Sequence, residues 1–284
     1  MSDTCFYIGT RRRLFEMRAP SVSLPSRKQG FSRELNFLNG GTSVRRSVSA
    51  HKRYTMTWNV LPIDEARILL DLADGIYGTG EIYWFDTLVN DRNMLPQQWA
   101  SPFQGLYDGL PLNGDGRGTR VATPANSLDM PSFSIEYNVG AGEPKTTWIP
   151  IPPGYTAHVG AYGQNGTGGT VLATPTVGPT ALGTPVNLTL LDVTNPARFN
   201  QTFAASAGNN GVLLSLGGSG TVTLTAMMVQ VLKDGVAPET GGFISGQGHS
   251  GCSFVAQPDY TPYSAALDQV GVVAEFVETG MWSQ

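Results

Sequence analysis

The sequence contains little charge, few cysteines and no long apolar segment. Asp, Glu, Lys and Arg make up only 14% of its 284 residues, well below the roughly 25% of an average soluble domain. Its two cysteines, Cys5 and Cys252, allow at most one disulfide, which excludes a fold built on a disulfide framework. No apolar run reaches the roughly 18 residues of a membrane-spanning helix, and residues 1–17 lack the apolar core of a signal peptide. We therefore predict that the chain neither inserts into a membrane nor crosses one on its own.

Patterns that carry catalysis or bind metals are also scarce. The three histidines, His51, His158 and His249, lie far apart in sequence and have no metal-ligand spacing. Residues 248–252, GHSGC, resemble a nucleophile elbow but carry a cysteine where that motif requires glycine. Residues 113–116, NGDG, offer too few oxygens for calcium, which takes about six to eight. We predict that the protein is not an enzyme and holds no metal or cofactor.

Glycine and proline are abundant instead. The 35 Gly and 19 Pro residues clearly exceed the roughly 12% that these two residues contribute to an average protein. Together with many short apolar runs, they predict a mainly β protein with many turns. The length allows one large domain or two of ordinary size.

Residues 43–60 alternate between two faces. Met56 and Trp58 lie on the even-numbered face, whereas every odd-numbered position from 45 to 59 is polar. This predicts one long strand with one buried face, or two strands broken near His51 and Lys52.

One helix is predicted directly after this strand. Pro62 suits the first turn of a helix, and apolar residues follow at spacings of three and four up to Ala73. Gly75 and Gly78 are expected to end the helix. Residues 81–86 then have the composition of another strand.

The remainder predicts a second, inserted domain. Residues 87–131 are rich in turn residues and are interpreted as a connection. Short alternating segments typical of a β-sandwich follow at 133–139, 147–151, 155–162, 170–174, 186–193, 211–216 and 221–232. A last strand is predicted at 270–278, after the glycine-rich stretch 241–251. We predict an N-terminal β-barrel-like domain, 1–125 completed by 259–284, and a sandwich at 126–258.

Charge is unevenly distributed along the chain. Residues 1–54 contain 11 Lys or Arg against three Asp or Glu, a net charge of +8, so the rest of the chain carries −12. No aromatic platform interleaves these basic residues, and we predict no nucleic-acid binding. A basic face that meets an acidic face of the next subunit fits better, and a solvated strand face is the alternative. The candidate contact residues are Arg45, Arg46, His51, Lys52 and Arg53, whereas the cluster Arg11–Arg13 has no assigned role.

The first strands of the sandwich carry a group of aromatic residues. A ring face packs well on the apolar face of a sugar, but rings in sandwich strands usually belong to the core. Three glycine-rich turns, at 163–169, 208–211 and 217–220, accompany these strands. The candidate glycan-contact residues are Trp148, Tyr155, His158, Tyr162, Gln164 and Asn165.

Four long strings in the sequence resemble a known family. They are residues 40–52, 149–169, 235–252 and 260–268, beginning with GGTSVRR, IPIPPGY, GVAPETG and YTPYSAA. These strings resemble minor tail proteins of long-tailed phages that infect actinobacteria. The order of long strand, short helix and strand near the N-terminus is similar to the ring-forming domain of distal tail proteins.

The resemblance implies a structural role at the tail tip of a virion, assembled in the host cytoplasm. It implies that the last strand returns to the ring domain, and that the sandwich, of galectin or carbohydrate-binding-module type, faces outward. The expected partners are copies of the chain in a ring and other tail proteins such as the tail tube, the tape measure and the tail-tip hub. The alternative function is a module that binds host cell-wall glycan from the tail tip.

Overall fold

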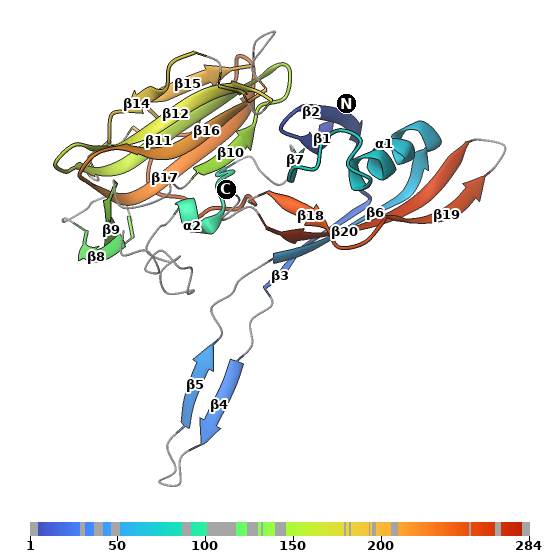
Figure 1. Ribbon diagram of the computed structural model, residues 1–284, viewed down its shortest axis with the longest axis horizontal. Coiled ribbons are helices and arrows are strands. Elements are labelled where there is room, and N and C mark those ends of the chain that lie inside the picture. Colours follow the sequence, from blue (N-terminus) through green and yellow to red (C-terminus); the bar gives the residue numbers. More distant parts are fainter. Residues whose placement is uncertain are drawn as a thin grey trace.

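A computed structural model of the chain is mainly β, with antiparallel strand pairing throughout the named sheets (Figure 1). For strands β3, β4 and β5 only the backbone is described. The structure describes residues 5–28, 32–36, 42–46, 52–86, 92–100, 118–123, 130–131, 133–139, 146–178, 180–181, 183–192, 194, 197–205, 210–249, 251–264 and 268–279.

An eight-stranded sheet gathers strands from both ends of the chain. Its order is β2-β1-β7-β18-β20-β6-β3, and β19 also pairs with β20. The strands are β1 (Cys5–Thr10), β2 (Arg13–Arg18), β3 (Val22–Lys28), β6 (Lys52–Pro62), β7 (Ile82–Asp86), β18 (Cys252–Phe254), β19 (Asp259–Ser264) and β20 (Gln269–Glu278). Together with helix α1 (Ile63–Ala73), this sheet is called the sheet lobe below.

Strand β6 shows the predicted alternation. Met56 and Trp58 are buried, whereas Arg53 and Asn59 are exposed. Strand β5 (Thr42–Arg46) pairs with β4 (Ser32–Asn36) and ends before β6 begins, which agrees with the two-strand alternative. The break was predicted near His51 and Lys52; Lys52 is the first residue of β6, and residues 47–51 lie outside the described residues.

Helix α1 covers one face of the sheet, as its apolar spacing predicts. Ala66, Leu69 and Leu72 are buried in a core with residues of β1, β6, β7 and β20. Pro62 precedes the helix as its N-cap residue instead of standing in its first turn. The chain turns away at Gly75, whose φ of 72° favours glycine.

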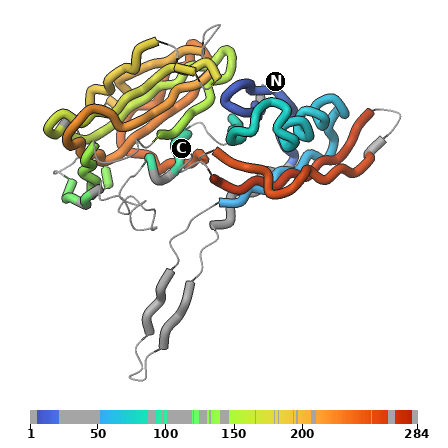
Figure 2. The backbone as a smooth tube through the Cα atoms, viewed as in Figure 1, coloured from blue at the N-terminus to red at the C-terminus, as the bar shows by residue number. Residues whose placement is uncertain are grey.

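The last strand joins the sheet lobe. β20 pairs with β6 along residues 269–277, so the C-terminal part of the chain lies beside residues 53–62 (Figure 2). This is the pairing that an inserted sandwich requires. The strands change sheets before the predicted boundaries, because β8 already belongs to the sandwich and β18 to the sheet lobe. The division into domains itself stays a prediction.

The expected barrel is not closed by the described strands. β2 and β3 end the eight-stranded sheet and do not pair with each other in the described part of the chain. The sheet is therefore open, with α1 on one face and the sandwich against part of the other.

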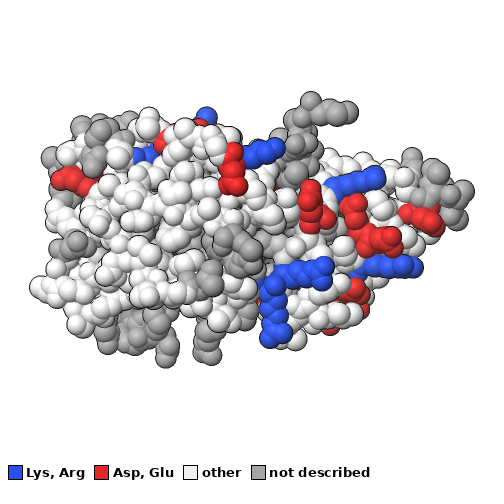
Figure 3. Space-filling model, turned by 90° about the horizontal axis from the view of Figure 1, so that it is seen from above, with Lys and Arg blue, Asp and Glu red and all other residues white. Residues whose placement is uncertain are grey.

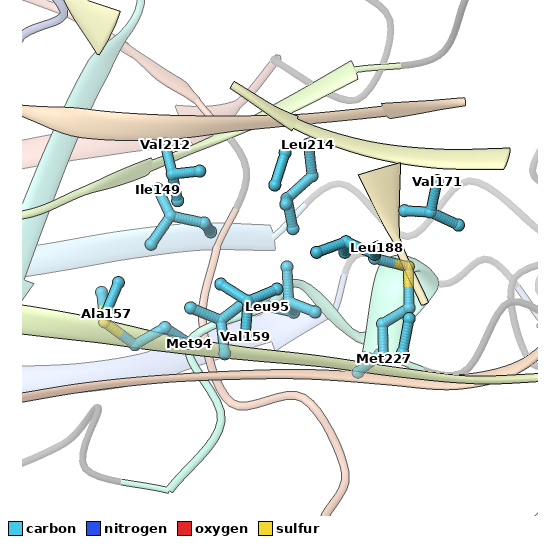
Figure 4. Packing of buried hydrophobic residues seen from close by; sticks show 14 of the residues in the cluster. Met94, Leu95, Ile149, Ala157, Val159, Val171, Leu188, Val212, Leu214 and Met227 are labelled. Atoms are coloured by element: carbon cyan, nitrogen blue, oxygen red, sulfur yellow. The ribbon is translucent and has the colours of Figure 1, made fainter. Parts of the chain in front are cut away.

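The sandwich consists of two five-stranded sheets. Figure 4 shows buried side chains of the two sheets pointing toward one another, among them Val212 and Leu214 on one side and Val159 and Met227 on the other. One sheet contains β10 (Thr146–Pro150), β12 (Gly169–Val177), β13 (Thr180–Ala181), β14 (Val186–Leu188) and β16 (Gly211–Gly218). The other contains β8 (Gly118–Ala122), β9 (Phe133–Asn138), β11 (Tyr155–Asn165), β15 (Gln201–Ala204) and β17 (Thr221–Lys233).

Most sandwich strands were expected from the sequence, with some differences. The segment predicted at 186–193 is a strand only over Val186–Leu188, and β8, β13 and β15 were not predicted. A short helix, α2 (Gln97–Ala100), lies in the predicted connection.

Candidate functional site

The most elaborate side-chain arrangement in the described chain is the joint between the sheet lobe and the sandwich. Tyr7 of β1 and Phe85 of β7 pack on Tyr155 of β11, with ring centroids 6.4 and 5.0 Å away. Tyr83 of β7 meets Trp148 of β10 edge to face at 4.7 Å. Because all five rings are at most 8% exposed, the contact between the lobes is buried, and the core of the sandwich extends onto Tyr7 and Phe85 of the sheet lobe.

The turn between β1 and β2 extends this joint with polar contacts. Asn210 donates a hydrogen bond from Nδ2 to the carbonyl oxygen of Arg11 at 2.8 Å. The Arg11 guanidinium carbon lies 5.8 Å from the centroid of the Trp148 ring. Arg13, in contrast, lies over Phe15 at 4.6 Å, within the sheet lobe. The basic cluster that had no role in the sequence is thus part of the packing at and near the joint.

Asn93 connects the two segments that cross between the lobes. Its side chain is fully buried, and Nδ2 donates to the carbonyls of Met227 and Ile244. Its Oδ1 accepts from the backbone N–H groups of Leu95 and Val229 at 3.2 and 3.1 Å. The amide therefore binds the outgoing segment 92–95 and the returning segment 244–248 to the edge of β17, as a buried polar group requires.

The returning segment ends at a buried His–Cys pair in the sheet lobe, where Cys252 is the first residue of β18. His249 stacks on Trp84, and its Nδ1 lies 3.7 Å from the Cys252 sulfur. Cys252 is fully buried. Burial raises the pKa of the Cys252 thiol well above its usual range, and the Glu278 and Glu81 carboxylates raise it further against an opposing effect of Lys52.

This environment disfavours thiolate chemistry. A reactive cysteine needs a lowered pKa and access to substrate, and Cys252 has neither. Burial likewise raises the pKa of Tyr54 far above its ordinary value, with Glu278 and Cys252 adding to the effect. The GHSGC string is therefore a packing element at this position, although Ser250 lies outside the described residues.

A small cavity at the joint encloses only about 10 Å³. This is near the minimum of about 10–15 Å³ that holds a single water molecule, so the cavity does not admit a sugar or a cofactor. Its lining comes from both lobes and from the crossing segments: Tyr83, Trp84, Met94, Trp148, Ile149, Pro150, Gly248 and His249.

The structure does not bring the predicted glycan-contact rings together on a surface. Trp148, Tyr155 and Tyr162 are 2, 8 and 0% exposed, so their faces pack in the interior. The Trp148 Nε1 donates to the Thr176 hydroxyl, and the Tyr162 hydroxyl donates to the Ala197 carbonyl. These three residues belong to the core, which was the alternative interpretation of the sequence.

The other predicted glycan-contact residues are more accessible. His158 is half-buried on β11, and burial lowers the pKa of its imidazole below 6.5. Gln164 is exposed, whereas the side chain of Asn165 lies outside the described residues. Glycan binding stays a prediction that now depends on His158, Gln164 and Asn165.

Two of the glycine-rich turns have a structural reason for their glycines. Gly168, between β11 and β12, and Gly220, between β16 and β17, have φ values of 117° and 122°. A Cβ at Gly168 would collide with the Ser219 carbonyl, and one at Gly220 with the Thr167 carbonyl. The two turns therefore pack backbone against backbone, which only glycine permits.

The predicted intersubunit residues are divided between different environments. Lys52 is half-buried and held within the chain, because its Nζ lies 3.5 Å from the Gly248 carbonyl and its N–H donates to Glu278. Arg53 is exposed on the outer face of β6. Arg45 and Arg46 lie on β5, whose side chains lie outside the described residues, as does His51 entirely. Contact between subunits stays a prediction.

Sequence reasoning missed Arg11, Asn93 and Asn210 as residues of the joint. Asn93 lies in the turn-rich segment interpreted only as a connection, and no sequence signal marks an asparagine that will be buried. One usable signal was present. Trp148 and Tyr155 lie near the start of the predicted sandwich, and the other predicted domain is also rich in aromatic residues.

Neither helix in the described residues is long and apolar enough to cross a membrane. Within the same stretches, no group of three or more His, Cys, Asp or Glu side chains is arranged to hold a metal ion. The sequence matches no protein-family model and no curated protein at a significant level.

Proposed function

We propose that the chain is a structural protein of a phage tail and not an enzyme. In this proposal it is a minor tail protein at the tail tip, forms a ring or adaptor layer with its own copies, and links neighbouring tail proteins. The tail tube, the tape measure and the tail-tip hub are the neighbours that the sequence resemblance implies. The finer description of the fold, a ring-forming domain with a galectin-type or carbohydrate-binding-module-type sandwich, belongs to the same proposal.

The observation that carries the proposal is the filled joint. Interfaces between domains are where ligand sites are often found, but here the rings of Tyr7, Phe85 and Tyr155 fill the described part of the interface, and the cavity beside them encloses about 10 Å³. A joint filled in this way holds the two lobes in a fixed arrangement instead of binding a substrate. This suits a protein whose role is to hold other proteins at fixed places.

The charge distribution supports assembly from identical copies. The first 54 residues carry +8 and the remainder −12, and in this proposal the basic segment of one copy meets an acidic face of the next. Head-to-tail contacts of this kind close into rings when the rotation between copies permits.

Charge reversal tests this assembly. We expect Arg45→Glu with Arg46→Glu to abolish or strongly reduce the multi-copy particles that the full-length chain forms, as measured by analytical ultracentrifugation and electron microscopy. The matched control is the double reversal of Arg67→Glu with Lys233→Glu, two exposed residues that lie outside the basic first 54 residues. Rings that persist in the first variant would remove β5 from the interface, and a chain that stays monomeric and absent from tails would overturn the proposal.

The alternative, a glycan-binding module on the tail tip, rests on the surface of the sandwich. On the face seen in Figure 3, charged residues gather on the sheet lobe and the sandwich is largely uncharged, which suits a neutral polysaccharide. Titration of the full chain with host cell-wall polysaccharide tests it, with His158→Ala and Gln164→Ala as variants. A micromolar affinity of one copy that both variants weaken would favour this alternative over a purely architectural sandwich.

A further inference from the structure

The β1–β2 turn rests on the sandwich through a directional set of hydrogen bonds. Asn210 is the centre of this set: its Nδ2 donates to the Arg11 carbonyl, and its Oδ1 accepts from the backbone N–H of Gly178 at 3.0 Å. Its own backbone N–H donates to the Thr176 carbonyl, and its carbonyl accepts from Ile151. One asparagine thus fixes two sandwich strands and the turn of the other lobe at the same time.

The Arg11 side chain adds a second contact at the same place. Its guanidinium lies over Trp148, which is only 2% exposed. The Trp148 ring is itself held in place, because its Nε1 donates to the Thr176 hydroxyl at 2.8 Å and Tyr83 packs against it edge to face. The side chain and the carbonyl of Arg11 therefore both require one placement of the turn.

A different kind of attachment joins the lobes where the chain crosses. There, segments 92–95 and 244–248 run together and are held by Asn93. In Figure 1, β1 and β2 lie on the upper side of the joint, and α2, next to the outgoing segment, lies on its lower side. The two attachments are thus separated across the joint.

The aromatic core between these attachments is less directional than a hydrogen bond, although its ring pairs meet edge to face. Apolar burial depends on area and not on angle, so Tyr7, Phe85 and Tyr155 remain buried after a modest rotation of one lobe against the other. Hydrogen bonds weaken steeply when their geometry is changed. The polar contacts of the turn are consequently more sensitive to the angle between the lobes than the apolar contacts are.

We propose that the Arg11–Asn210 contact is a clasp that fixes the orientation of the sandwich on the sheet lobe. Without it, the sandwich turns about the crossing segments 92–95 and 244–248 while the aromatic rings stay in contact. This role is independent of the proposed tail function, because it concerns a single copy of the chain.

Spin-label distance measurements on the isolated full chain test the clasp. Labels are attached at Thr79→Cys in the sheet lobe and Val236→Cys in the sandwich, both exposed, in a Cys5→Ser background where Cys252 remains buried. We expect a narrow distance distribution in the otherwise unchanged chain and a distribution about twofold wider or more in Asn210→Ala. The control Asn187→Ala, an exposed asparagine on the same lobe, should leave the width unchanged.

A replacement variant and a check of folding complete the test. If Asn210→Ala does not fold, Asn210→Asp takes its place, since it keeps the acceptor for Gly178 and loses the donor to Arg11. Circular dichroism establishes that the variant measured is folded. A distribution that stays narrow in the folded variant, or one that is already wide in the unchanged chain, would overturn the proposal.

Discussion

His249 lies flat against Trp84, with ring centroids 3.6 Å apart and 23° between the ring planes. Tyr54 meets both rings edge to face, at 5.9 and 5.0 Å. His249 belongs to the segment that returns from the sandwich, whereas Trp84 and Tyr54 belong to the sheet lobe. This stack fixes the point at which the chain re-enters the sheet.

We expect His249→Ala to lower the free energy of unfolding by about 2 kcal/mol, because the stack and the burial of the ring are both lost. Chemical denaturation measures the change. Asn187→Ala, an exposed asparagine on the sandwich, serves as a control and should stay within about 0.5 kcal/mol of the unchanged protein. A His249 variant as stable as this control would show that the stack does not anchor the chain.

Two residues of β20 offer a matched comparison on one strand. Phe276 is fully buried, and Val273 is 36% exposed on the opposite face. Phe276→Ala should cost about 3–5 kcal/mol through lost burial and the cavity left behind, whereas Val273→Ala should cost less than about 1 kcal/mol. Urea denaturation of both variants decides the point, and equal losses would mean that β20 does not have its Phe276 face in the core.

The Cys252 thiol should be protected in the folded protein. In a Cys5→Ser background, we expect a thiol reagent at pH 8 to react at least about 100-fold more slowly with the folded chain than with the unfolded one. Burial and the raised pKa of the thiol act in the same direction. The absorbance of the chromophore that the reagent releases follows the reaction. Rapid labelling of the native chain would contradict the burial of Cys252.

His158 predicts a pH dependence of stability. Burial lowers the pKa of its imidazole in the folded protein, so below pH about 6.5 the unfolded chain binds a proton that the folded chain does not. Stability contributed by the neutral form is therefore lost as the pH falls from about 6.5 toward the lowered folded-state pKa. Between pH 7.5 and 5.5, His158→Gln should show a smaller decrease in the free energy of unfolding, and identical decreases in both proteins would exclude this effect.

The sequence predicted those strands whose pattern is local. Strands β6 and β9 and helix α1 each bury one face. The periodic spacing of their apolar residues along the sequence therefore predicts them directly. Strand β15 and the β18 segment were not predicted, since each is short and is defined by its pairing with distant strands. The open edge between β2 and β3 also depends on long-range geometry, so a sequence pattern does not distinguish it from a closed barrel.

The side-chain arrangement of the joint was less predictable. Trp148 occupies the face of β10 that periodicity assigns to the outside of the sandwich, opposite Ile149. It is nevertheless buried, because Tyr83 and the Arg11 turn, more than 60 residues earlier in the chain, cover that face. Sequence alone does not reveal which outer face another lobe will cover, and for this reason the ring was a candidate for ligand contact.

The outgoing segment 92–95 and the returning segment 244–248 cross between the two lobes side by side. The Gln247 N–H donates to the Asn93 carbonyl at 2.9 Å, and the Gly248 N–H to the Leu95 carbonyl at 3.2 Å. A lobe that is joined to its neighbour at two adjacent points of the chain can be exchanged as a unit. Recombination at those points would replace the whole sandwich and leave every strand register of the sheet intact. An incoming sandwich would need to cover Tyr7, Tyr83 and Phe85 and to pack against the Arg11 turn. The predicted insertion would thus allow the sandwich to be exchanged while the sheet lobe that carries it stays unchanged.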